Sequence, residues 1–185
     1  MHLDFWESQI HASDFIMNVI RYGYFISFVT EPIAVLLKNN KSAFQHRDFV
    51  ESAINELLVS GIVEEQTDKP FVVNPLSVAV NSEGKCRLIL DLRHVNQCID
   101  KRKFKMEGIV HALQMVMKNG FMYKFDLKSG YHHVDIHKLH QKYLGFSWKF
   151  ESKTRYFIFT CLPFGLSSAP YLFTKLLKVG QILEM

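Results

Sequence analysis

Residues 72–92 hold two short runs of β-compatible side chains around a turn, and this pattern limits the folds open to the chain. The run 81–84, Asn-Ser-Glu-Gly, supplies turn residues between the two runs. Alternation on both sides of such a turn predicts a β-hairpin. Lys85 and Arg87 leave the turn two residues apart, so both should project from one face of the second strand. The alternating apolar residues are Val78, Val80, Leu88 and Leu90.

The remaining segments mix helical and strand patterns without regular alternation of the two. Apolar residues recur at helical spacing after Arg47, and Gly61 ends that pattern. Residues 1–40 combine aromatic residues with Gly and Pro, which indicates loops and short elements. The order predicts an α+β fold. Further helices are expected over 107–118 and from 167 onward, and strands over 62–63, 121–127, 131–137, 143–150 and 154–161.

Composition and charge narrow the class of protein. Hydrophobic residues make up 48% of the 185 residues, enough for a buried core. Residues 1–84 carry a net charge of −6 and residues 85–185 a net charge of +10. The basic half suits a phosphate-rich partner, although a solvated charged face gives the same pattern.

No secretory signal or membrane span is expected. The amino terminus lacks a basic start, and polar residues interrupt the apolar stretch 15–37. Cys86, Cys98 and Cys161 form no CxxC pair, which argues against structural zinc and for a reducing compartment. An intracellular location, in the cytoplasm or nucleus, is therefore expected.

Asp126 stands where a short apolar run meets a Lys-Ser-Gly turn. A carboxylate at a strand end can bind Mg²⁺, which prefers hard oxygen ligands. Taken alone, an Asp before such a turn is more often a turn or capping residue.

Three segments that occur in a fixed order favour the metal-binding role of Asp126 over the turn or capping role. Residues 87–96 (RLILDLRHVN), 125–131 (FDLKSGY) and 162–170 (LPFGLSSAP) resemble the core motifs of reverse transcriptases. The sequence at 91–96 and 131–133 is most similar to that of the DIRS-type, tyrosine-recombinase retrotransposons. The resemblance covers residues 45–178. It implies the fingers and partial palm of a right-hand polymerase, arranged as a leading segment 1–44, a fingers-like part 45–120 and a partial palm 121–185.

The resemblance also implies roles for single residues. Asp126 matches the first catalytic aspartate, which binds two Mg²⁺ ions together with the backbone carbonyl of Leu127. Arg87, and by a looser match Lys85, would contact the triphosphate of the incoming deoxynucleotide. Tyr131 matches the aromatic residue that excludes a ribose 2′-hydroxyl.

Two further groups of residues are assigned in the same way. Phe164 and Gly165 match the segment beside the primer terminus and the incoming nucleotide. Asp91, Arg93 and Asn96 match a fingers motif and are read as structural or template-facing. The implied partners are an RNA or DNA template-primer and deoxynucleoside triphosphates.

Four histidines near residue 135 offer a competing interpretation. His133 and His137 are four apart, which on a helix would suggest zinc, and His132 and His140 flank them. The segment 131–137 alternates like a strand, so a solvent-facing or template-side strand is the preferred reading.

The family's third motif, a pair of aspartates, is missing from the chain. The acids after Asp126 are Asp135, Glu151 and Glu184. The first hypothesis is therefore a truncated reverse transcriptase domain that is inactive alone. A second is a non-catalytic nucleic-acid-binding remnant. A third is an unstable remnant with an exposed sheet edge that promotes aggregation.

Overall fold

The computed structural model describes residues 3–100, 102, 104, 108, 110, 113–114, 116–117, 120–121 and 126–180. The elements, in chain order, are α1 (Leu3–Ser8), α2 (Asp14–Tyr22), β1 (Val35–Leu36), α3 (Lys41–Gln45), α4 (Arg47–Val59), β2 (Val63–Gln66), β3 (Val72–Asn74), β4 (Leu76–Val80), β5 (Cys86–Leu90), α5 (Arg93–Asn96), η1 (Gly130–His133), α7 (Lys138–Gln141), β6 (Gly145–Phe150), β7 (Lys153–Phe159) and α8 (Ala169–Gly180). Most of the helix expected over 107–118 and of the strand expected over 121–127 lies outside the described residues.

A five-stranded sheet organises the core. Its strand order is β1-β3-β6-β7-β2, with parallel pairs at β1–β3 and β3–β6 and antiparallel pairs at β6–β7 and β2–β7. The hairpin β6–β7 turns through Glu151, whose φ is 47°. Both of its strands and the strand after Gly61 agree with the sequence prediction.

Helices α3 and α4 pack on the sheet around Trp148. The indole is 1% exposed, stacks on Phe44 at 5.5 Å between ring centroids and donates a hydrogen bond of 3.0 Å to Glu51. Val50 and Ile54, one turn apart on α4, are fully buried. The predicted apolar face of this helix is thus the face that covers the core.

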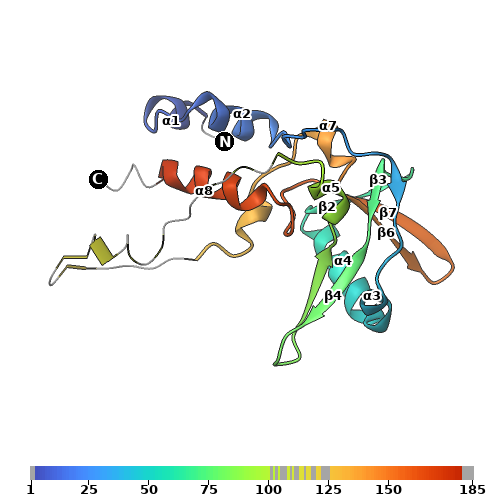
Figure 1. The fold of residues 1–185 in the computed structure, drawn as a ribbon. Coiled ribbons are helices and arrows are strands. Elements are labelled where there is room, and N and C mark those ends of the chain that lie inside the picture. The colour runs from blue at the N-terminus through green and yellow to red at the C-terminus, as the bar shows by residue number, and fades with distance from the viewer. Residues whose placement is uncertain are drawn as a thin grey trace.

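The predicted hairpin is formed by β4 and β5, which project from the body of the protein (Figure 1). The side chain of Asn81 closes its turn by accepting hydrogen bonds from the N–H groups of Glu83 and Lys85, and Gly84 adopts a φ of 78°. At its base, the Leu76 N–H donates to the side chain of Asn39 at 2.8 Å. The hairpin is therefore anchored at one end and solvated at the other.

The strand predicted over 131–137 is wrong in its first half. Residues 130–133 form the short 3-10 helix η1 instead. The chain bends at Ser129, which has a φ of 54°, and the helical turn follows directly after this bend. Val134 and Ile136 do point the same way, into the core, as predicted. His133 is consequently not on a strand face with His137, which instead precedes α7.

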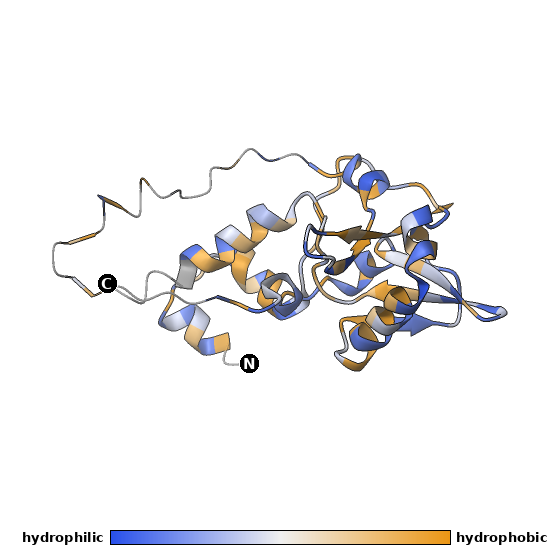
Figure 2. Cartoon of the chain, turned by 90° about the horizontal axis from the view of Figure 1, so that it is seen from below, coloured by the Kyte–Doolittle hydropathy of each residue, from blue (hydrophilic) through white to orange (hydrophobic). Residues whose placement is uncertain are grey.

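The last helix, α8, begins where the sequence predicts a helix, and Pro170 lies in its first turn. Ser168 directly precedes this helix, and its hydroxyl has no hydrogen-bond partner among the described residues. Figure 1 shows α1 and α2 beside α8, and Figure 2 shows apolar residues along these helices. Among the described residues, no helix is long and apolar enough to cross a membrane.

Candidate functional site

A hollow of about 400 Å³ brings together several residues that the sequence nominates. Asp126, Leu127 and Tyr131 line it from the segment after the motif aspartate, and Phe164 lines it from the loop before α8. Four positions that the sequence did not nominate complete the wall: Ser129, Gly130, Phe173 and Leu177. Phe173 and Leu177 are four apart on α8, so helical periodicity alone could have predicted that they share a face.

The turn between Asp126 and Tyr131 is held tightly against α8. The Gly130 N–H donates to the carbonyl of Leu127 at 3.1 Å. A Cβ on Gly130 would stand 2.6 Å from Cζ of Phe173. A Cβ at this position would therefore displace the tip of the Phe173 ring, and glycine lets the turn approach the helix without that shift.

Aromatic rings form one wall of the hollow. The Tyr131 ring lies 5.0 Å from that of Phe164 and 5.1 Å from that of Phe173, centroid to centroid. The His132 ring, which does not itself line the hollow, meets Phe164 edge-on at 5.3 Å. Burial raises the pKa of Tyr131, and burial together with the charge of His133 lowers the pKa of His132. Near neutral pH the wall is therefore uncharged, which suits a flat aromatic or sugar group.

The side chain of Asn96 fastens the loop that carries Phe164. Its amide nitrogen donates to the carbonyl of Gly165 at 2.9 Å, and its oxygen accepts from the N–H of Ser167 at 2.8 Å. Gly165 has a φ of 95°. Asn96 thus has a structural contact with the loop, while Gly165 lies next to the hollow without lining it.

Asp91 and Arg93 form a two-pronged ion pair away from that hollow. The guanidinium donates to the carboxylate at 2.9 Å from Nε and 2.6 Å from Nη2, and this lowers the pKa of Asp91. The side chain of Arg93 is 83% exposed. The pair borders a second hollow, of about 390 Å³, with Lys38 and His94. A basic side chain is thus presented to solvent in a fixed orientation.

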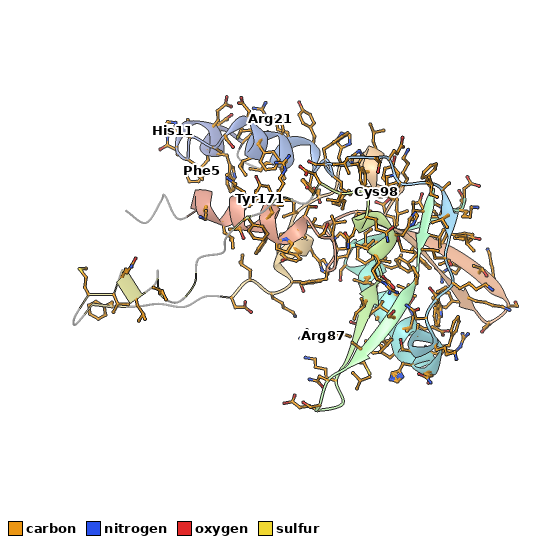
Figure 3. All side chains as sticks on the ribbon, viewed as in Figure 1. Phe5, His11, Arg21, Arg87, Cys98 and Tyr171 are labelled. Atoms are coloured by element: carbon orange, nitrogen blue, oxygen red, sulfur yellow. The ribbon has the colours of Figure 1, made fainter. Side chains whose placement is uncertain are left out.

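Lys85 and Arg87 lie on the β4–β5 hairpin, and both side chains are exposed. Their neighbours Cys86 and Leu88 are only partly exposed. Arg87 projects from one side of that hairpin (Figure 3). The alternating exposure of residues 85–88 agrees with the predicted shared face, and Lys85 directly precedes the strand. Neither cation lines the hollow around Asp126, so the structure does not bring them together with that carboxylate.

The described residues do not by themselves fit a magnesium ion. Asp126 is exposed at the hollow, and no cluster of three His, Cys, Asp or Glu side chains that could hold a metal occurs in the part of the chain that the structure describes. One carboxylate and one carbonyl leave most positions around a six-coordinate ion to other ligands.

The histidines have other contacts. His140 is buried, and its Nδ1 accepts a hydrogen bond of 3.0 Å from the N–H of Ile26. Its ring lies 3.8 Å from that of Phe25, centroid to centroid. His133 Nε2 is 3.3 Å from the carbonyl oxygen of Lys128. His140 is therefore part of the core, and His133 contacts the turn after Asp126.

Comparison with known proteins gives a consistent answer. A family model described as "Reverse transcriptase (RNA-dependent DNA polymerase)" matches residues 78–181. The Pol polyprotein from transposon 412 of Drosophila melanogaster is 28% identical over 150 residues, which are 79% of this chain and 12% of that protein. The genome polyprotein of Petunia vein clearing virus (isolate Shepherd) is 33% identical over 112 residues, 60% of this chain and 5% of the polyprotein.

Among solved structures, a foamy viral protease-reverse transcriptase in complex with double-stranded DNA is similar, with a TM-score of 0.63 and 22% identity. The match covers 88% of this chain and 33% of that one. It confirms the predicted α+β fold, whose sheets and helices are consistent with fingers and palm parts. The chain therefore spans a small part of the relatives and a third of the solved structure.

Proposed function

Because the chain belongs to the reverse transcriptase family, we propose that it forms the nucleotide-binding part of a retroelement RNA-directed DNA polymerase. One observation carries this proposal: Asp126, Leu127, Tyr131 and Phe164, which come from two motifs 36 residues apart, line one hollow. A hollow with a carboxylate at its mouth and aromatic rings along its wall suits a deoxynucleotide.

Within that hollow, each side chain has a proposed task. The ring of Tyr131, fixed between two phenylalanines, excludes a ribose 2′-hydroxyl. Phe164 and Gly165 support the nucleotide and the primer terminus. Asp126 and the Leu127 carbonyl are proposed as ligands of the Mg²⁺ ions that supply two-metal nucleotidyl transfer in this family. The described residues do not complete that ion's coordination, so the tasks assigned here are binding and orientation.

The hairpin cations are proposed to contact the triphosphate. Lys85, directly before β5, and Arg87, on β5, are both exposed, which leaves their charged groups open to a phosphate. Residues 1–44, 45–120 and 121–185 are proposed as a leading segment, a fingers-like part and part of a palm. The sequence at 91–96 and 131–133 supports an origin in a DIRS-type element.

We further propose that these 185 residues do not complete the transfer alone. The sequence has no adjacent pair of aspartates, and a two-metal site needs carboxylates beyond that of Asp126. Binding rather than turnover is therefore the informative measurement.

The test uses a fluorescent RNA–DNA template-primer and the full chain. Complementary deoxynucleotide with Mg²⁺ should slow release of the template-primer, whereas a mismatched nucleotide should not. Asp126→Asn should remove this effect. Asp68→Asn, an exposed carboxylate outside the three motifs and outside the lining of the hollow, is the matched control. The proposal is wrong if both variants keep the nucleotide effect, or if the unmodified chain shows none.

A second candidate function is nucleic-acid binding without catalysis. The net charge of +10 over residues 85–185 favours it. Salt-sensitive binding that ignores the identity of the added nucleotide would support it. Lys85→Glu with Arg87→Glu should then weaken binding, and Lys69→Glu with Lys138→Glu, two exposed lysines elsewhere, should weaken it less. Equal losses from both pairs would reject a specific role for the hairpin.

A further inference from the structure

Phe164 lines the hollow from a loop whose main chain is fixed on both sides of the residue. Before it, the Leu162 N–H donates to the carbonyl of Val134 at 2.8 Å. After it, the side chain of Asn96 donates to the carbonyl of Gly165 at 2.9 Å. The ring of Phe164 itself is 56% exposed. Hydrogen bonds therefore fix the backbone of the loop, whereas the direction of the ring depends on the side chains that it contacts.

Two consecutive rings of η1 contact Phe164. Tyr131 lies tilted at 35° with 5.0 Å between the ring centroids, and His132 lies edge-on at 74° and 5.3 Å. Tyr131 is held from its other side by Phe173 at 5.1 Å. The four rings thus form a row, in the order Phe173, Tyr131, Phe164 and His132. Edge-on pairs of aromatic rings are favourable beyond the area that they bury, so this row resists rotation of its members.

His132 ends the row without reaching the hollow. The residue is only partly exposed, and it does not line the hollow around Asp126. Its Nδ1 is buried and has no hydrogen-bond partner among the described residues. A buried polar atom without a partner destabilises a fold, so hydrogen bonding of Nδ1 does not account for a histidine at this position. What the ring contributes is its edge-on contact with Phe164.

From this arrangement we infer that His132 is a positioning residue, whose ring fixes the orientation of Phe164 at the hollow that takes the nucleotide. Because His132 does not line that hollow, it acts on the nucleotide only through Phe164. The inference rests on the proposed function, which assigns the hollow to a deoxynucleotide. It adds to that function a residue that sets the shape of the aromatic wall from behind.

The first measurement needs no nucleotide. Para-fluorophenylalanine is placed at residue 164 of the full chain, and its fluorine NMR shift is compared with that of the urea-unfolded chain. A neighbouring aromatic ring displaces this shift. His132→Leu keeps apolar bulk without a ring and should lose part of the displacement, and His132→Gln should lose it to the same extent. His132→Phe keeps a ring at this position and should retain the displacement.

The matched control is His137→Leu. His137 is also a partly exposed histidine that meets a phenylalanine edge-on, Phe25 at 5.1 Å, but it does not line the hollow. Its replacement should leave the fluorine signal of residue 164 unchanged. The inference is overturned if His132→Leu and His132→Gln leave that signal where it is, if His137→Leu shifts it as far, or if His132→Phe shifts it like the leucine variant.

A second measurement tests the consequence for the nucleotide, in the template-primer assay described above. His132→Leu should raise the concentration of complementary deoxynucleotide that gives half of the slowing by about two- to tenfold, the effect of one lost aromatic contact. His132→Phe should restore the value of the unmodified chain, and His137→Leu should not change it. Equal concentrations for His132→Leu and the unmodified chain would overturn the inference.

The two measurements separate failure of the inference from failure of the proposed function. If no chain responds to the nucleotide but the fluorine signal depends on a ring at residue 132, the proposed function fails and the positioning contact stands. If the unmodified chain responds to the nucleotide and the fluorine signal is independent of residue 132, the inference fails and the proposed function stands.

Discussion

Gly130 and Phe173 are in close contact: a Cβ on residue 130 would stand 2.6 Å from Cζ of the ring, so a larger residue there requires the ring to move. The contact joins the turn after Asp126 to the last helix. It sets how far Tyr131, the next residue, lies from α8. The geometry of the candidate site therefore depends on a glycine that is not itself a functional group.

Gly130→Ala should push the Phe173 ring aside and destabilise the protein by about 1–3 kcal/mol, as overpacking does in other cores. Urea denaturation measures the loss. Phe173→Leu shortens the opposing side chain, so the double variant should lose less stability than the sum of the two single losses. Strict additivity of the two changes would show that the contact does not limit this position.

Asn96→Ala should release the loop that carries Phe164. The variant loses one hydrogen bond to Gly165 and one from Ser167, which together contribute about 1–3 kcal/mol. Denaturation should show that loss, and limited proteolysis should cut the loop faster. Gln97→Ala, an exposed neighbour, is the control and should change neither. Equal proteolysis of the two variants would contradict the proposed fastening.

Arg155, on β7 between β6 and β2, should stabilise the sheet more through its packing than through its charge. Its guanidinium lies 4.8 Å and 5.3 Å from the ring centres of Phe150 and Phe157, and it forms an ion pair with Glu65. Glu65→Gln should cost less than about 1 kcal/mol, because that carboxylate is largely solvated. Arg155→Ala should cost more, because it also uncovers the rings. A double-mutant cycle between the two positions measures their coupling.

His140 should make the fold sensitive to acid. Burial, and then the nearby charges of His137 and Lys142, lower its pKa from 6.5 to about 4, while Glu31 acts in the opposite direction. On acidification the unfolded chain takes up this proton first, near pH 6.5, and the folded chain only near pH 4. Stability is therefore lost as pH falls through that window, by up to about 3 kcal/mol.

Equilibrium denaturation at pH 7, 5.5 and 4 measures this loss. His140→Asn keeps an acceptor for the Ile26 N–H but does not titrate, so its stability should fall less with pH. His11→Gln, which changes an exposed histidine, should retain the full dependence. The assignment to His140 is wrong if the two variants show the same slope.

Local patterns in the sequence were sufficient to predict the β4–β5 and β6–β7 hairpins and α4, because each depends on neighbours within about 15 residues. The parallel pairs of β1 with β3 and of β3 with β6 join distant segments, and alternation of side chains does not reveal such pairs. The error at 131–133 has a similar origin. The alternation of Val134 and Ile136 does not continue backward, because residues 130–133 form a turn that is held by local hydrogen bonds and by the contact of Gly130 with Phe173.

The site was predicted in part for a related reason. Motif order led to Asp126, Leu127, Tyr131 and Phe164, which do line one hollow. Phe173 and Leu177 were missed because an apolar pair on a helix usually indicates core packing. The hydrogen bonds from Asn96 to the loop join residues about 70 positions apart in the sequence, and no local sequence pattern predicts such a contact.

The contacts of Asn96 also have an evolutionary consequence. Both of its hydrogen bonds end on main-chain atoms, the carbonyl of Gly165 and the N–H of Ser167. Every residue has a carbonyl and, apart from proline, an N–H, so the partner side chains can change while these bonds remain. Selection for the loop's position should consequently fall on residue 96 alone, and pairwise covariation with residue 167 should be weak.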